Sequence, residues 1–160
     1  MAMKKKELMA GAPAPDINLP TDGAEPFSLS ALRGKTVVLY FYPKDDTAGC
    51  TTEAIDFSAA GKAFARAGAV VVGVSKDGVE KHARFRKKHG LSVILASDED
   101  GKALAKYGVW VKKTLYGRTY MGIERSTFLI DGKGIIREAW RKVRVAGHVE
   151  AVLEATKGLK

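Results

Sequence analysis

The sequence predicts an α/β protein with a central mixed β-sheet and helices on both faces. Two apolar runs that are rich in β-branched residues, 37–42 and 69–75, are typical of strands buried on both sides. Helical patterns separate these runs, and a hairpin signal followed by a last helix ends the chain. Strands that alternate with helices before a terminal hairpin indicate a sheet that lies between helical layers.

The chain begins with a basic segment over residues 1–14 that becomes rich in Ala, Gly and Pro. Gly11 and Pro13 interrupt its apolar part, so we interpret it as a mobile tail rather than a signal peptide. A chain of 160 residues suits one domain, expected over residues 15–160. Its apolar runs are too short to span a membrane, and a lone cysteine agrees with a reducing compartment, so we expect a cytoplasmic protein.

Glycines and polar turns set the other expected boundaries within the domain. A helix that starts near Cys50 is expected to run to about Ala67, where Gly68 stops it. The turn over residues 131–134, Asp-Gly-Lys-Gly, is the hairpin signal. The remaining elements are expected as short edge elements at 16–19 and 27–32, helices at 79–89, 101–107 and 149–157, strands at 92–96, 127–130 and 135–140, and a basic aromatic loop at 110–122.

Cys50 is the only cysteine, and the sequence brings it from a buried strand into the first turn of a helix. Pro43 ends the strand, and Thr47 is the expected N-cap, which places Cys50 at about the third helical position. Open N–H groups and the helix dipole favour negative charge there. The thiolate, which is the reactive form of cysteine, is therefore favoured.

The alternative for Cys50 is a small buried apolar residue with no chemical role. It shares a helical stripe with Ala54, Phe57 and Phe64, which fits the spacing of core residues. A lone cysteine is most often such a core residue. The residues that flank Cys50 favour the chemical role instead.

Pro43, Thr47 and Cys50 stand in the spacing Pro-x-x-x-Thr-x-x-Cys, the active-site motif of the peroxiredoxins. Four segments in the family's order extend the similarity over most of the chain: YFYPKDDTAGCTTEAIDF, GVSKDGVEKHARFRKKHGL, LASDEDGKALAKYGVW and ERSTFLIDGKGII. The chain therefore resembles the bacterioferritin-comigratory-protein, or Q, class of peroxiredoxins. This resemblance implies a thioredoxin-like fold.

The resemblance also implies the roles of five residues. Cys50 would be the peroxidatic nucleophile, Thr47 would bond the thiolate and the peroxide, and Pro43 would shield the sulfur. Arg125 matches the active-site arginine, and Glu53 matches a residue that usually orders the site. The alternatives are a surface arginine in an ion pair for Arg125 and a solvated helix glutamate for Glu53.

The chain departs from the family pattern at two positions. Ala48 stands where the family often has proline, which loosens the turn but removes no catalytic group. Ile55 stands where many members carry a resolving cysteine, so this would be a one-cysteine variant. Its Cys50 sulfenic acid would then need an external thiol, such as thioredoxin, glutaredoxin or a small thiol, or Cys50 of another subunit. Monomer and homodimer both stay open.

The implied activity is a cofactor-free, thiol-dependent peroxidase for hydrogen peroxide and organic hydroperoxides. A different class of function is a non-enzymatic thioredoxin-fold protein, either a peroxide sensor or a chaperone. An enzyme would turn over with added thiol, whereas a sensor would be oxidised once. A disulfide oxidoreductase is disfavoured because Thr52 and Glu53 follow where Cys-x-x-Cys would place its second thiol.

The net charge of +9 raises a nucleic-acid alternative. The cations and aromatics gather in two places, the helix at 79–89 and the loop at 110–122. We interpret them as a solvated basic face and a cover over the active-site side, and expect no nucleic-acid partner. His82, His89 and His148 lack metal-ligand spacing, so no metal site is expected.

Overall fold

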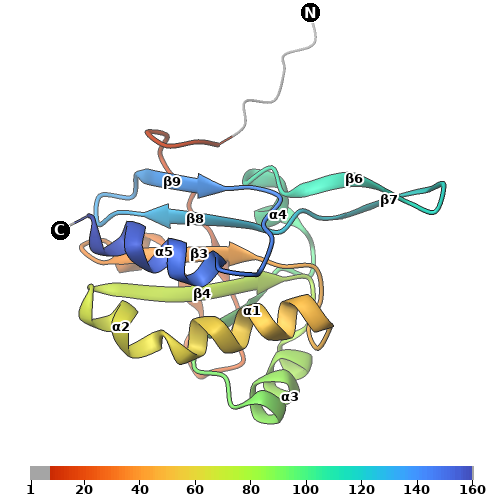
Figure 1. The fold of residues 1–160 in the computed structure, drawn as a ribbon, viewed down its shortest axis with the longest axis horizontal. Helices are drawn as coiled ribbons and strands as arrows, with labels where there is room; N and C mark the ends of the chain where they lie inside the picture. The colour runs from red at the N-terminus through yellow and green to blue at the C-terminus, as the bar shows by residue number, and fades with distance from the viewer. Residues whose placement is uncertain (1–7, 160) are drawn as a thin grey trace, which may run out of the picture.

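One five-stranded mixed β-sheet forms the centre of the computed structural model, which describes residues 8–159 (Figure 1). Its strands are β3 (Thr36–Phe41), β4 (Ala69–Ser75), β5 (Ile94–Ser97), β8 (Ser126–Ile130) and β9 (Ile136–Trp140). In space they follow the order β5-β4-β3-β8-β9. The central strand β3 pairs in parallel with β4 and antiparallel with β8, which makes the sheet mixed as predicted.

Helices cover both faces of this sheet, which confirms the predicted fold class. One face carries α1 (Ala48–Ala59), α2 (Gly61–Arg66) and α5 (His148–Lys157), and α3 (Val79–His89) contacts the same core through Phe85 (Figure 1). The other face carries α4 (Lys102–Lys106) together with β1 (Asn18–Leu19), β2 (Phe27–Ser28) and the 3₁₀ helix η1 (Ser30–Leu32). Among residues 8–159, no helix combines the length and the hydrophobicity that crossing a bilayer requires.

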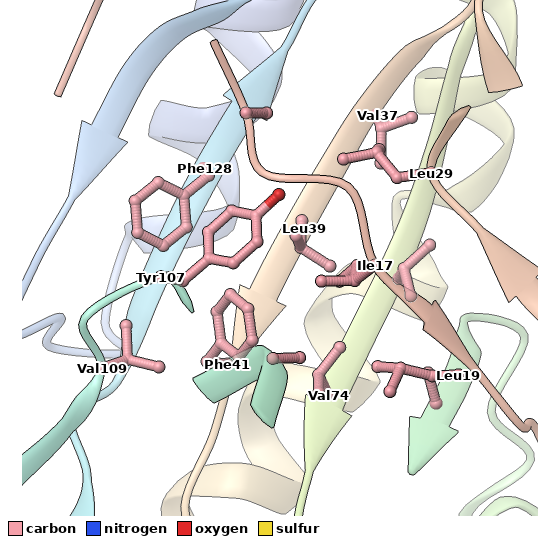
Figure 2. Packing of buried hydrophobic residues seen from close by; sticks show 14 of the residues in the cluster. Ile17, Leu19, Leu29, Val37, Leu39, Phe41, Val74, Tyr107, Val109 and Phe128 are labelled. Atoms are coloured by element: carbon pink, nitrogen blue, oxygen red, sulfur yellow. The ribbon is translucent and has the colours of Figure 1, made fainter. Parts of the chain in front are cut away.

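Strand β3 is buried on both sides because its side chains alternate between the two cores. Val37, Leu39 and Phe41 pack with Tyr107 and Phe128 in one core (Figure 2). The intervening side chains, Val38, Tyr40 and Tyr42, enter the core under α1 and α5. An uninterrupted apolar run is therefore what this central position requires. The end of β3 is consequently a rigid support for the residues that follow it.

The helix expected to run continuously from Cys50 to Ala67 is divided in two, so that prediction is wrong. Ala60 lies between the two helices, as the C-cap of α1 and the N-cap of α2, and Gly61 is the first residue of α2. Glycine has a low helix propensity, which explains a break at this point. Phe57 and Phe64 still pack together across the break, with ring centroids 5.8 Å apart.

The stretch expected as a loop at 110–122 is a β-hairpin, which is a second correction. Strands β6 (Trp110–Leu115) and β7 (Arg118–Ile123) pair antiparallel and project from the body of the molecule (Figure 1). Tyr116 and Gly117 have φ angles of 50° and 75°, as the two central residues of a type I′ turn require. The sequence conceals the hairpin because tyrosine replaces the usual Asn or Asp and because polar and apolar side chains are mixed on both faces.

Residues 11–14 lie along β9, although they belong to the segment expected as a mobile tail. The amide of Gly11 donates to the carbonyl of Ile136 at 2.7 Å, and the amide of Ile136 donates to the carbonyl of Ala12 at 2.9 Å. This part of the segment is thus fastened to the sheet edge. Residues 1–7 lie outside the described part of the chain, and the assignment of residues 15–160 to one domain stays a prediction.

Candidate active site

Cys50 lies at the N-terminus of α1, directly after the loop that leaves β3. It is the third residue of the helix, as predicted, and is only 1% exposed. Thr47 occupies the N-cap position in an extended conformation. The thiol is therefore held at the positive end of the helix and shielded from bulk water.

The Thr47 hydroxyl does not cap the helix, which corrects one expectation. It donates instead to the carbonyl of Lys44 at 2.8 Å, and among the described residues no side chain caps α1. The first N–H groups of the helix consequently remain open to a ligand or to the sulfur. The roles of Thr47 toward the sulfur and of Pro43 as its shield stay predictions.

Arg125 is the residue that contacts the sulfur. It lies just before β8, and its Nη2 donates to Cys50 Sγ at 3.3 Å. Its Nη1 donates to Glu53 Oε1 at 2.6 Å. Although burial opposes it, the negative charges of Glu53 and Cys50 raise the pKa of Arg125 above its ordinary value. The guanidinium is thus a fixed positive charge that connects two residues of the same helix.

Glu53 is completely buried, so the alternative of a solvated helix glutamate is wrong. Cys50 and Glu53 are three residues apart on α1 and face the same guanidinium. Burial raises the pKa of Glu53 to about 7, while the charge of Arg125 and its hydrogen bond act in the opposite direction. Its second oxygen, Oε2, has no hydrogen-bond partner among the described residues. Glu53 therefore anchors Arg125 with one oxygen and keeps the other unused.

Gly49 is a site residue that the sequence analysis did not single out. A Cβ atom at Gly49 would lie 3.1 Å from Arg125 Nη2, closer than most such contacts. The absence of a side chain here lets the guanidinium approach Cys50 from across the helix N-terminus. The sequence shows a glycine directly before the cysteine, but only the position of Arg125 in the structure explains why a glycine is needed there.

Lys113 of the β6–β7 hairpin also lies within electrostatic reach of the site. Burial and the positive charge of Arg125 lower the pKa of Lys113, while the negative charges of Cys50 and Glu124 oppose this shift. His148, at the start of α5, is a second neighbour of Arg125. Burial and that positive charge lower the pKa of His148 to about 4, so it is neutral near pH 7. Arg125 is thus the dominant charge of the region.

Ile55 stands apart from the sulfur. Its side chain is 42% exposed, whereas Cys50 is buried, so the two residues occupy different sides of α1. Since Cys50 is the only cysteine in the sequence, this chain supplies no second thiol.

Several cations of α3 are paired with neighbouring carboxylates. Lys81 Nζ lies 2.8 Å from Asp77, and Lys88 Nζ lies 2.7 Å from Asp46. Arg86 is engaged by Asp22 through two hydrogen bonds. These pairs involve three of the five Lys and Arg side chains of α3. Within the described part of the chain, His, Cys, Asp and Glu form no group that could hold a metal ion.

Comparison with known proteins gives consistent matches along the chain. The sequence profile of the AhpC/TSA family matches residues 10–139. Putative peroxiredoxin bcp of Coxiella burnetii is 50% identical over 143 residues, covering 89% of this chain and 95% of that protein. Peroxiredoxin Bcp of Bacillus subtilis is 48% identical over 149 residues, covering 93% and 95% respectively.

Solved structures give the same result for the fold. The bacterioferritin comigratory protein of Xanthomonas campestris, whose structures with a trapped intermediate and ligand were analysed for alkyl peroxide reduction, superimposes with a TM-score of 0.85. It is 45% identical, and the match covers 89% of this chain and 91% of that one. The predicted thioredoxin-like architecture is thereby confirmed, since this solved structure is a peroxiredoxin with the same fold.

Proposed function

Because this chain belongs to the AhpC/TSA family of peroxiredoxins, we propose that it is a thiol-dependent peroxidase that uses Cys50 to reduce hydrogen peroxide and organic hydroperoxides. One observation carries the proposal: Arg125 holds its guanidinium 3.3 Å from Cys50 Sγ while Glu53 anchors the other arm. A cysteine with no chemical role would have no need of a partly buried cation fixed beside it. The study of alkyl peroxide reduction by the Xanthomonas campestris relative supports organic hydroperoxides as substrates.

The proposed reaction is a displacement at oxygen. The Cys50 thiolate attacks the terminal peroxide oxygen, an S–O bond forms and the O–O bond breaks. The departing alkoxide or hydroxide takes a proton from solvent and leaves as alcohol or water, and Cys50 becomes a sulfenic acid. Negative charge moves from the sulfur to the two oxygens during this step.

Arg125 and the open end of α1 are placed to stabilise that moving charge. The guanidinium presents several N–H groups in one plane, so it can bond the sulfur before the reaction and the peroxide oxygens during it. The uncapped N–H groups of the first helical turn add further donors. Thr47 and Pro43 complete the proposed set, as a polar contact for the peroxide and as a shield for the sulfur.

Reduction of the sulfenic acid requires a thiol from outside the chain. A first thiol would form a mixed disulfide with Cys50 and release water, and a second would restore the Cys50 thiol and leave as a disulfide. We propose thioredoxin, glutaredoxin or a small thiol as donor, because no second cysteine is present. Cys50 of another subunit is the other possible partner. A cytoplasmic location, where such thiols are kept reduced, fits this requirement.

A turnover assay tests the proposed function. Peroxide consumption is followed in the presence of excess dithiothreitol, or of thioredoxin with its reductase, for the wild type and for Cys50→Ser. We expect many equivalents of peroxide to be consumed per wild-type chain and none by the variant. Consumption that stops after one equivalent, even with thiol present, would indicate a sensor instead of an enzyme.

A further inference from the structure

The loop at residues 42–47, which carries Pro43 and Thr47 into the active site, is fastened to α3 at a buried contact. Asp45 and His82 have completely buried side chains, and His82 Nδ1 lies 2.6 Å from Asp45 Oδ2. The other imidazole nitrogen, Nε2, lies 3.0 Å from the carbonyl of Ala96 at the sheet. His82 therefore connects the active-site loop to β5.

The hydrogen-bond geometry determines how this contact holds its protons. A carbonyl only accepts, so Nε2 of His82 must carry a hydrogen. A second proton must lie between Nδ1 and Asp45 Oδ2, because two lone pairs at 2.6 Å would repel each other. Asp45 Oδ1 accepts the Tyr42 hydroxyl at 2.5 Å. Every polar atom of the buried pair is thus satisfied, as a fixed buried contact requires.

The next residue of the loop is fastened to the same helix at its surface. Asp46 adopts a left-handed conformation with φ of 61°, and its carboxylate contacts Lys88 Nζ at 2.7 Å and His89 Nε2 at 2.9 Å. His82 and His89 are seven residues apart, or about two helical turns, and hence lie on one face of α3. The two histidines thus hold two consecutive aspartates of the loop.

The backbone of the loop is held as well. The amide of Asp45 donates to Asp77 Oδ2 at 2.7 Å, and the same oxygen accepts the Ser75 hydroxyl at 2.7 Å. Lys81 of α3 neutralises the second oxygen of Asp77 at 2.8 Å. Since a loop is normally the most mobile part of a fold, this number of contacts points to a requirement for fixed geometry.

We infer that His82 is a positioning residue for the peroxidase reaction, which acts through Asp45 on the loop that leads to Cys50. This inference rests on the proposed function, because it concerns the geometry of the same site. His82 does not contact the sulfur in the structure, so it cannot act on peroxide directly. Its effect is to hold the loop residues and the start of α1 in the arrangement that receives the peroxide, where errors of about 1 Å cost roughly 100-fold in rate.

A pair of substitutions separates the two hydrogen bonds of His82. In His82→Asn the side-chain NH₂ takes the place of Nδ1 and keeps the bond to Asp45. In His82→Gln it takes the place of Nε2, keeps the bond to Ala96 and abandons Asp45. We expect His82→Gln to lower the second-order rate with hydrogen peroxide by about 10- to 100-fold, and His82→Asn to stay within about threefold of the wild type.

Alkylation by iodoacetamide is the second measurement on the same variants. It needs an accessible thiolate but none of the donors that activate a peroxide, so we expect its rate to change much less than the peroxide rate in His82→Gln. Equal losses in both rates would overturn the inference. So would equal peroxide rates in the Asn and Gln variants, which would make His82 a purely structural residue.

Arg86→Gln is the matched control, because Arg86 belongs to α3 but its guanidinium bonds residues outside the loop. Its guanidinium bonds Asp22 and the carbonyls of Leu91 and Val93. We expect this variant to lower the melting temperature and to keep the wild-type peroxide rate. A rate that falls in proportion to stability in both helix variants would contradict a positioning role.

If His82→Gln does not fold, Asp46→Asn provides a second test of the inference. This side chain is 41% exposed, and asparagine tolerates the left-handed conformation. We expect a loss of about two- to fivefold in peroxide rate with little change in melting temperature, since exposed ion pairs contribute little stability. An unchanged rate would overturn the inference. A wild-type protein that consumes no peroxide would instead refute the proposed function.

Discussion

Two buried carboxylates lie on either side of the Cys50 region, and the protein treats them differently. Asp45 uses both oxygens, one for Tyr42 and one for His82. Glu53 uses one oxygen for Arg125, and its other oxygen has no partner within residues 8–159. A fully bonded carboxylate can only fix geometry, whereas a half-bonded one remains free to respond to its surroundings.

The difference appears in the charge of the site. Burial raises the pKa of Glu53 to about 7, so Glu53 is only partly ionised at neutral pH while it anchors Arg125. Asp45 shares a proton with His82 in a contact closed to solvent. The comparison indicates a division of tasks: the loop side sets the positions of atoms, and the α1 side sets the electrostatics around Cys50.

The largest loss of peroxide consumption is expected on substitution of Cys50, because both regions surround its sulfur. Cys50→Ser should abolish peroxide consumption, because a hydroxyl is not ionised near neutral pH and is a poor nucleophile toward peroxide. The assay is peroxide loss with excess thiol, and circular dichroism verifies that the fold is kept. Residual consumption at the wild-type rate would remove Cys50 from the mechanism altogether.

Arg125→Ala tests the α1 side of the comparison. It removes the donor to sulfur and leaves Glu53 buried without its cation, so we expect the second-order peroxide rate to fall by about 100-fold or more. Arg125→Lys is the control, since it keeps a positive charge but cannot bond Cys50 and Glu53 together in one plane. Stopped-flow kinetics measures both. An unchanged rate in the alanine variant would withdraw the role assigned to Arg125.

Glu53→Gln tests whether Glu53 is the responsive carboxylate. In the folded protein, burial raises the pKa of Glu53 from its ordinary value of 4.5 to about 7. The folded state therefore holds more protons than the unfolded state between these values, and the contribution of Glu53 to stability falls as pH rises through this window. Glutamine does not titrate, so this fall should disappear.

The measurement is the free energy of unfolding of both proteins at several pH values. We expect the difference between Glu53→Gln and wild type to grow in favour of the variant by roughly 1–3 kcal/mol between acidic and neutral pH. If the difference in free energy of unfolding between Glu53→Gln and wild type stays constant with pH, Glu53 does not titrate in this pH range.

Gly49→Ala gives the smallest expected effect. Alanine favours the helix by up to about 1 kcal/mol, so stability should rise slightly. Its Cβ would lie 3.1 Å from Arg125 Nη2 and displace the guanidinium by a fraction of an ångström. We expect the peroxide rate to fall by about threefold while the melting temperature rises. A simultaneous rise in both would mean that Arg125 tolerates the new methyl group.

Much of the sheet could be predicted because β3 and β4 are apolar on both faces, which only a central position explains. The hairpin at residues 110–123 escaped prediction for the opposite reason. Polar and apolar side chains are mixed on both of its faces and most are exposed, and Tyr116 takes a left-handed conformation that glycine or asparagine normally marks. A strand pair without a buried face leaves little periodicity in a sequence.

Some residues of the candidate site could likewise be predicted from the sequence, whereas others could not. Cys50, Thr47 and Pro43 lie in one short motif, so local sequence places them, and resemblance adds Arg125 and Glu53. The contact between His82 and Asp45 joins residues 37 positions apart and depends on how α3 packs beside the loop. The importance of Gly49 likewise depends on the guanidinium of Arg125, which lies far along the chain. Such tertiary contacts have no local signature.

The most direct test of Cys50 chemistry is the intact mass of the reduced protein after mixing with one equivalent of hydrogen peroxide under non-reducing conditions. We expect a rapid gain of one oxygen that a sulfenic-acid reagent traps and added thiol reverses. A doubled mass would show that Cys50 pairs between subunits after the same oxidation. An unchanged mass over minutes would contradict the proposal and leave Cys50 as a buried residue of the core.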